Sequence, residues 1–362
     1  MATDIQETKV NEINVEYYTP PFYRRVLANV IDVIFFLLSF IGLFIGVREI
    51  ATSTSEYQEN MITMATIKLE SCLFVPNTLP AQDVDDYIVS TDKDVPDDIK
   101  VITDIVSVIS DDYWFGVDKK NEIAQAAISG FHNYCQIACT NEDYQAIMAD
   151  YESFMLSDEL VDDYGVHYFV KVGENNIIVN VECTVPSNRT FFKKGYAPYI
   201  DEHAQGYLVT SIPDYYECTK YLSNILTFVE IPISYLLSGL LIYLLPVLIF
   251  RRGRMTFGKA IYRIGSLDSH FLSPKIGRTM ARFAIFYFAE LILALFTLGI
   301  PFIISFSLMA FSKKKQGFPD YMLNIVEVDG YRTKIFMSKE EIALKGIDTH
   351  AKPVDFKVRQ KL

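Results

Sequence analysis

Cysteine is scarce in this chain and confined to one part of it. The 362 residues include only five cysteines, Cys72, Cys135, Cys139, Cys183 and Cys218, and no C-x-x-C pair. Because the number is odd, at least one is free or pairs with another molecule. Cys135 and Cys139 are one helical turn apart and could form a metal site with His132. Small buried cysteines on a helix are the simpler interpretation, so we predict no metal.

Signatures of common enzyme chemistries are also missing. Gly258-Lys259 is not part of a G-x-x-x-x-G-K-S/T loop, so the sequence does not predict nucleotide binding. The chain has no nucleophile-elbow, zincin or kinase pattern. We therefore expect neither an enzyme nor a bound cofactor.

Basic and acidic residues are unevenly distributed, and each type is scarce in one region of the chain. Residues 48–220 carry 30 Asp/Glu against 11 Lys/Arg, a net of −19, although the whole chain carries only −12. Residues 251–282 hold eight basic residues and one acidic residue. The acidic region disfavours nucleic acid as a partner and suits a protein or a cationic ligand.

Long apolar runs set the class of protein. The mean hydropathy is +0.17 while 22% of the residues are charged, which indicates a mixed membrane and soluble architecture. Three apolar runs, 24–47, 221–250 and 283–311, are long enough to enter a bilayer, which takes about 20 residues to cross as a helix. The first run has no small-residue cleavage site, so we expect a retained span rather than a signal peptide. The sequence thus predicts a multi-pass protein of the cell membrane, in contact with the lipid bilayer.

The basic clusters predict the orientation in the membrane. By the positive-inside rule, the loop 251–282 is cytoplasmic, which puts the arm 1–23 inside and residues 48–220 outside. The run 283–311 is followed by Lys313-Lys314-Lys315 and contains the helix-breaking Leu298-Gly-Ile-Pro301. We expect a broken, hairpin-like segment and a basic cytoplasmic tail, 312–362. A single tilted crossing remains the alternative.

Residues 48–220 form a predicted inserted domain with helical stalks. Amphipathic helices are predicted over Asp97–Tyr113, Lys120–Cys139 and Glu142–Leu160. Strands are predicted over Gly165–Val172, Asn176–Val185 and Tyr207–Ile212. The predicted fold class is a mainly α membrane protein: a small helical transmembrane bundle plus an inserted α+β soluble domain.

Two segments of the chain resemble each other. Residues 257–268 and 318–329 align without gaps, each running from an aromatic residue through a short helix into a strand-like end. We expect segments so alike to pack together on one side of the membrane, with an ion pair between Lys259 and Asp320, which occupy matching positions. Chance similarity of two amphipathic segments is the alternative.

Charged residues interrupt the apolar runs. Arg25 and Asp32 are seven residues apart and share one helix face. Asp32 could carry protons or cations, or form a fixed ion pair with Arg25 or with a basic residue of the loop 251–282. Glu230 and Glu290 could join it in a polar centre between helices, or lie at the membrane interface.

Three motifs resemble those of the RDD family of bacterial membrane proteins. They are the opening Phe22-Tyr-Arg-Arg25 with Asp32, the middle Thr256-Phe-Gly258-Lys259, and the closing Lys315-Gln316-Gly-Phe-Pro-Asp320. The resemblance covers about 17–46 and 221–329 and identifies Arg25, Asp32 and Asp320 as the family's eponymous residues. Lys315 and Pro319 depart from the usual arginine and histidine. The resemblance implies transport, which for some members of the family includes cation/proton exchange.

Two hypotheses for function follow from these features. One is transport or ion handling by the intramembrane charged residues. The other is a membrane-anchored sensor or scaffold whose outer domain binds a ligand or a protein, which the size of the insert favours. With three or four helical segments, a transporter this small would have to be a homo-oligomer.

Overall fold

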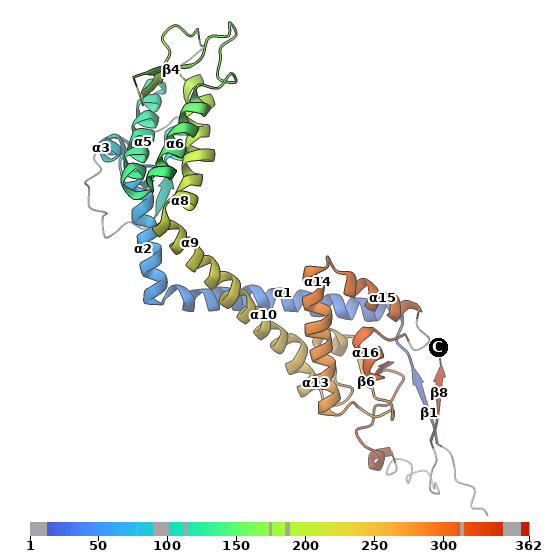
Figure 1. The fold of residues 1–362 in the computed structure, drawn as a ribbon. Coiled ribbons are helices and arrows are strands. Elements are labelled where there is room, and N and C mark those ends of the chain that lie inside the picture. The colour runs from blue at the N-terminus through green and yellow to red at the C-terminus, as the bar shows by residue number, and fades with distance from the viewer. Residues whose placement is uncertain are drawn as a thin grey trace, which may run out of the picture. The chain divides into compact units, whose positions relative to one another are not determined.

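The computed structural model describes residues 13–77, 79–89, 101–111, 115–173, 176–184, 189–311, 315–342 and 356–361. The chain is mostly helical and divides into two compact units (Figure 1). Unit 1 comprises Met1–Glu49 and Glu230–Leu362, and unit 2 comprises Ile50–Val229.

Two helices in the described part of the chain are long and apolar enough to cross a membrane. They are α1 (Phe22–Thr52) and the helix Pro213–Ile249, which begins with α9 (Pro213–Ile225). The second starts earlier than the predicted span 221–250. After the first span the chain is still helical, but α1 ends at Thr52 and a separate helix, α2 (Ser55–Glu70), follows.

Two prolines, Pro232 and Pro246, lie inside the second long helix. Proline lacks an N–H, and its ring crowds the carbonyl four residues earlier. Each proline follows a wider π-helical turn, which lets the helix continue without a break. The order is η3 (Leu226–Glu230), α10 (Ile231–Gly239), η4 (Leu240–Leu244) and α11 (Leu245–Ile249).

The third apolar run is not one helix. A helix built from α13, η5 and α14 ends at a turn in which Leu298 and Gly299 both have positive φ, and α15 then packs back against η5 (Figure 1). Glycine adopts such a φ at little cost, whereas leucine does not. The bounds are α13 (Ile276–Ala284), η5 (Ile285–Ile292), α14 (Leu293–Phe296) and α15 (Ile300–Phe311).

The two similar segments fold alike and pair, as predicted. Each is a short helix followed by a strand: α12 (Phe257–Ile261) with β6 (Ile264–Leu267), and α16 (Phe318–Leu323) with β7 (Val326–Asp329). The strands pair antiparallel, with Ser266 opposite Glu327. These two residues also match in the sequence alignment, so an approximate two-fold axis passes between them.

The N-terminal arm is not wholly irregular. β1 (Ile13–Tyr18) pairs in parallel with β8 (Phe356–Lys361), which joins the two ends of the described chain. The Tyr18 N–H also donates to Thr333 Oγ1 at 3.0 Å. The sequence predicts no strand at either place, because this pairing joins segments that are distant in the chain.

Unit 2 has its own hydrophobic core, built mainly around α5, α6 and the helical segment 189–211. Two short antiparallel strand pairs, β2–β3 and β4–β5, complete it. The remaining bounds are β2 (Phe74–Pro76), α3 (Ala81–Val89), β3 (Ile102–Asp104), α4 (Ile105–Ser110), α5 (Val117–Ala138), α6 (Asn141–Met155), β4 (Phe169–Val172), β5 (Asn176–Val179), α7 (Arg189–Phe191), η1 (Phe192–Tyr196), η2 (Tyr199–Ala204) and α8 (Gln205–Ser211).

Two predicted elements of unit 2 are wrong. The strand predicted over Tyr207–Ile212 is helix α8, and buried Tyr196, Ile200, Ala204 and Leu208 recur at the four-residue spacing of a helix face. The helix predicted over Asp97–Tyr113 is the strand β3 followed by the short helix α4 within the described residues. Local β-branched composition and apolar content misled both predictions.

Candidate functional site

One face of α1 is buried in unit 1. Arg25, Ala28, Asp32 and Phe36 are its buried residues, at the spacing of a helix face, whereas most of its apolar side chains are exposed. The predicted placement of Arg25 and Asp32 on one face is confirmed.

Asp32 caps a helix of another segment. Its carboxylate accepts hydrogen bonds from Thr256 Oγ1 at 2.5 Å and from the Gly258 N–H at 2.7 Å. It thereby occupies the place of an N-cap for α12, where a negative charge also suits the helix dipole. A Cβ added at Gly258 would lie 2.0 Å from the Ala28 carbonyl oxygen, so only glycine allows this approach of α12 to α1.

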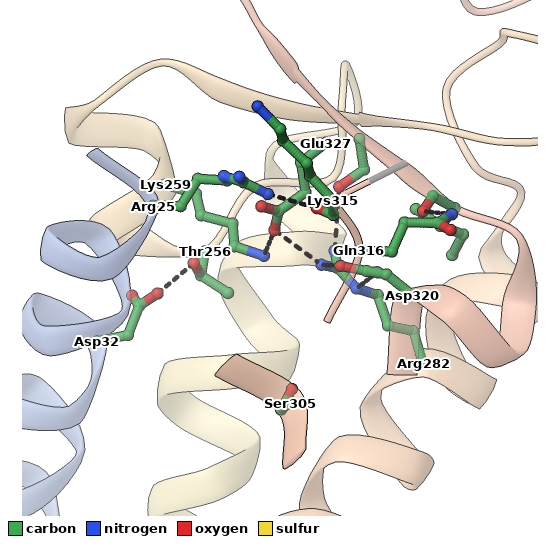
Figure 2. Close-up of polar contacts among 12 residues, drawn as sticks. Arg25, Asp32, Thr256, Lys259, Arg282, Ser305, Lys315, Gln316, Asp320 and Glu327 are labelled. Atoms are coloured by element: carbon green, nitrogen blue, oxygen red, sulfur yellow. Dashed lines mark hydrogen bonds and ion pairs between the residues drawn. The ribbon is translucent and has the colours of Figure 1, made fainter. Parts of the chain in front are cut away.

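Charged residues from the two similar segments and from α13 meet beside α1, and we call them the charged cluster. Figure 2 shows Glu327 between the side chains of Lys259 and Arg282. Glu327 Oε1 lies 2.5 Å from Lys259 Nζ and 3.4 Å from Arg282 Nη2. The guanidinium of Arg282 also reaches both oxygens of Asp320, at 2.7 and 2.8 Å. The charged cluster consists of Arg25, Lys259, Arg282, Asp320 and Glu327.

The field of the cluster acts differently on its two carboxyl groups. Burial by itself would raise the pKa of Glu327, but the charges of Lys259 and Arg282 outweigh it and hold the pKa at about 2. Burial raises the pKa of Asp320 above its ordinary value, against the opposing pull of Arg282 and Lys259. Glu327 is therefore a fixed charge of the cluster over the physiological pH range.

Arg25 completes the cluster from α1. Its side chain is 2% exposed, and Nη1 donates to the Lys315 carbonyl oxygen. Nε and Nη2 are buried and have no hydrogen-bond partner among the described residues. Glu327 and Asp320 are the carboxylates of the cluster near Arg25. The cluster thus sets three cations against two carboxylates.

Glu290 lies in η5, close enough to the cluster to interact electrostatically with Asp320, Lys259 and Arg282. Its side chain is hydrogen-bonded to Ser305 of α15, whose hydroxyl also accepts from the Phe318 N–H at 3.0 Å. Glu290 is 3% exposed, and its Oε2 has no hydrogen-bond partner in the described structure.

Two predicted pairings of charges are wrong. Within the described residues, no ion pair or hydrogen bond joins Arg25 to Asp32, because Asp32 is held by Thr256 and Gly258. Lys259 does not pair with Asp320, because the register of β6 and β7 brings Glu327 to Lys259 and leaves Asp320 to Arg282.

The site differs from the sequence-based prediction in its membership: two cluster residues were not predicted, and one predicted residue does not join the cluster. Glu327 and Arg282 were missed, although a glutamate in the apolar strand Val-Glu-Val-Asp is a detectable signal. Glu230 is 2% exposed, and the Ser234 hydroxyl donates to its backbone carbonyl. No ion pair or hydrogen bond among the described residues joins Glu230 to the cluster. The described residues hold no group of three or more His, Cys, Asp or Glu placed to bind a metal.

The fold and the cluster define a mostly helical, membrane-associated domain with buried ion pairs between short helix–strand segments. The RDD family model matches residues 208–324, so the chain contains an RDD family domain there. This range includes Glu230, Lys259, Glu290 and Asp320 but not α1. Neither a curated protein nor a solved structure matches the chain.

Proposed function

We propose that the RDD domain handles protons or monovalent cations at a membrane, with Glu290 as the exchanging group. The observation that carries this proposal is a buried carboxyl in an apolar helix, whose Oε2 has no hydrogen-bond partner among the described residues. Carboxyl groups at membrane depth commonly serve proton or cation pathways.

The charged cluster has a different role in this proposal. Two fixed ion pairs hold the short segments together: Lys259–Glu327 joins α12 to β7, and Arg282–Asp320 joins α13 to α16. Their charges provide a constant field at Glu290, because neither pair has to open when Glu290 binds or releases a proton. The proton itself goes on and off the Glu290 carboxylate, and a cation competes for the same oxygens.

The orientation that we propose has the N-terminus, the loop 251–282 and the C-terminal segment in the cytoplasm, and residues 48–220 outside the cell membrane. The contacts of unit 1 support it. Arg24 Nη1 pairs with Asp329 Oδ2 at 2.9 Å, which joins the start of α1 to β7. The pairing of β6 with β7 joins the loop after the second long helix to the segment after α15. These contacts support our proposal that the three parts share one side of the membrane.

Flux through the purified full-length protein tests the function. The protein is reconstituted in liposomes that contain a pH-sensitive dye, and an outward Na⁺ or K⁺ gradient is imposed. We expect proton movement that depends on the gradient and that Glu290→Gln lowers at least about tenfold, the effect of 1.4 kcal/mol. Glu340→Gln, a matched change at an exposed glutamate of unit 1, should leave the flux unchanged. Wild-type protein without flux, or a folded Glu290→Gln variant with full flux, would reject the proposal.

A second candidate function is a membrane-anchored sensor or scaffold. The properties of unit 2 favour this sensor or scaffold function. The unit has a separate hydrophobic core and contains nearly all of the acidic region 48–220. In that case unit 2 is an inserted soluble domain outside the membrane that binds a ligand or a protein, and unit 1 anchors it.

A further inference from the structure

Unit 2 contains a pocket of about 280 Å³ between α4, α5 and the start of the helical segment 189–211. Basic side chains from two elements line it, together with two adjacent carboxylates of η2 and an apolar wall. The residues that matter here are Lys120, Arg189, Phe192, Lys193, Asp201 and Glu202. The volume is near the lower end of the range of small-molecule sites.

Lys120 is the least exposed of the charged residues in the pocket. Its side chain belongs to a residue that is 1% exposed, and Nζ donates to the Ser110 carbonyl oxygen at 3.3 Å. Lysine is rarely buried to this extent, because an ammonium group loses its hydration when it leaves water. Lys120 therefore contributes a buried positive charge beside the pocket.

The placement of charge in the pocket is unusual for this unit. Residues 48–220 have only 11 basic residues, and Lys120, Arg189 and Lys193 are three of them. Exposed Lys193, Asp201 and Glu202 form no ion pair with any described residue. Both signs of charge are therefore available to a ligand within one small pocket.

We infer that this pocket binds a free amino acid, or a ligand of the same zwitterionic class. Exposed Lys193 suits the ligand's carboxylate, in the positive field of Lys120 and Arg189, and Asp201 and Glu202 suit its ammonium group. Phe192 supplies an apolar surface for the ligand's side chain. A simple anion would leave the two carboxylates opposed to it, and a simple cation would meet the three basic groups.

The inference does not depend on ion handling by Glu290, and it names a ligand class for the second candidate function. Its test uses binding to unit 2 in the full-length protein, so it can fail without affecting the flux experiment. Likewise, the flux experiment can fail without affecting the binding test.

Thermal unfolding of the full-length protein in detergent, followed by calorimetric titration, provides the test. The probes are the individual L-amino acids at millimolar concentration, with acetate and methylamine as single-charge controls. We expect at least one amino acid to raise the unfolding temperature and to bind saturably, and both controls to have no effect. Absence of stabilisation by every amino acid, or equal binding of acetate, overturns the inference.

Two exposed positions test the pocket without risk to the core. Lys193→Ala and Asp201→Asn should each weaken binding about tenfold or more, the effect of losing roughly 1.4 kcal/mol of interaction. Lys220→Ala changes an exposed lysine of unit 2 that is paired with Glu217 outside the pocket, and it should bind like the wild type. Wild-type affinity in both pocket variants would place the ligand elsewhere and reject this site.

Discussion

The Lys259–Glu327 pair shows how a single residue can set the stability of unit 1. The two atoms are 2.5 Å apart, and both side chains are at most 10% exposed. A buried pair is costly to break from one side, because the remaining charge stays in a poorly solvating site. Stability therefore depends on the presence of both partners more than on either alone.

We predict that Lys259→Met and Glu327→Gln each lower the free energy of unfolding by roughly 3–5 kcal/mol. The double variant should lose less than the sum of the two. Arg25→Gln with Asp32→Asn should instead be additive within about 0.5 kcal/mol, since these residues share no contact. Denaturant unfolding in mixed micelles measures both cycles. Additivity in the first cycle, or strong coupling in the second, would contradict the observed pairing.

Gly258 offers a sharper test with a matched control. A Cβ at Gly258 would lie 2.0 Å from the Ala28 carbonyl oxygen, whereas a Cβ at helical Gly277 would meet nothing within 4 Å. We predict that Gly258→Ala separates α12 from α1 and breaks the Gly258–Asp32 hydrogen bond, with a loss above about 3 kcal/mol. Gly277→Ala should be neutral or stabilise by up to about 1 kcal/mol through helix propensity. Similar melting temperatures for the two variants would count against the close approach.

His132 gives unit 2 a pH dependence. Burial lowers the pKa of His132 from 6.5 to about 4, and its Nε2 lies 3.2 Å from Tyr199 Oη. Between these two pH values the unfolded chain binds the proton and the folded chain does not. The folded state therefore loses stability as pH falls from 6.5 towards 4, by up to about 3 kcal/mol.

Unfolding of wild-type protein and His132→Phe at pH 7 and at pH 5 checks this prediction. The wild type should lose more stability between the two pH values than the variant, in which this proton-binding group is absent. Equal losses in both proteins would show that His132 is not the responsible group.

At the scale of elements, the break between α14 and α15 is the feature from which we predict the path of this apolar segment through the membrane. The apolar helix ends with α14 at Phe296, and the turn that follows contains Gly299, whose φ is +86°. Helix α15 then turns back and packs on α16 and η5. We predict that the apolar segment enters the membrane and returns, with the C-terminal segment in the cytoplasm.

Cysteine labelling in intact cells tests the return. After replacement of the five native cysteines, single cysteines are placed at exposed Asp158, His270 and Lys339. A membrane-impermeant thiol reagent should label position 158 in intact cells, and positions 270 and 339 only after permeabilisation. Labelling at 339 but not at 270 in intact cells would indicate a single crossing instead.

At the scale of the whole molecule, the two units have separate cores. Unit 2 buries a large set of apolar side chains of its own, including Phe131, Ile147, Phe169 and Tyr196. A continuous core of this kind is what an independently folding domain requires.

We therefore predict that residues 55–225, expressed alone, form a soluble acidic domain with a helical circular dichroism spectrum and a cooperative melt. The cut removes the apolar parts of α1 and of the second long helix. Aggregation, or a spectrum without helix, for every boundary tried within a few residues of this cut would show that the core depends on unit 1.

Local patterns in the sequence determined much of this protein. Four features depend on patterns within short segments of the chain. They are the apolar runs, the break at Leu298–Gly299, the shared helix face of Arg25 and Asp32, and the likeness of residues 257–268 to 318–329. Periodicity and turn chemistry are local properties, so the sequence displays them directly.

Only the tertiary structure decided which charges meet. Lys259 could have paired with Asp320 as well as with Glu327 on charge alone, and the register of β6 against β7 selects Glu327. Asp32 binds Thr256 and the Gly258 N–H rather than Arg25, because α12 approaches α1 closely at Gly258. Hydrogen bonds and ion pairs form over about 3 Å, so partners depend on packing between segments that lie far apart in the chain.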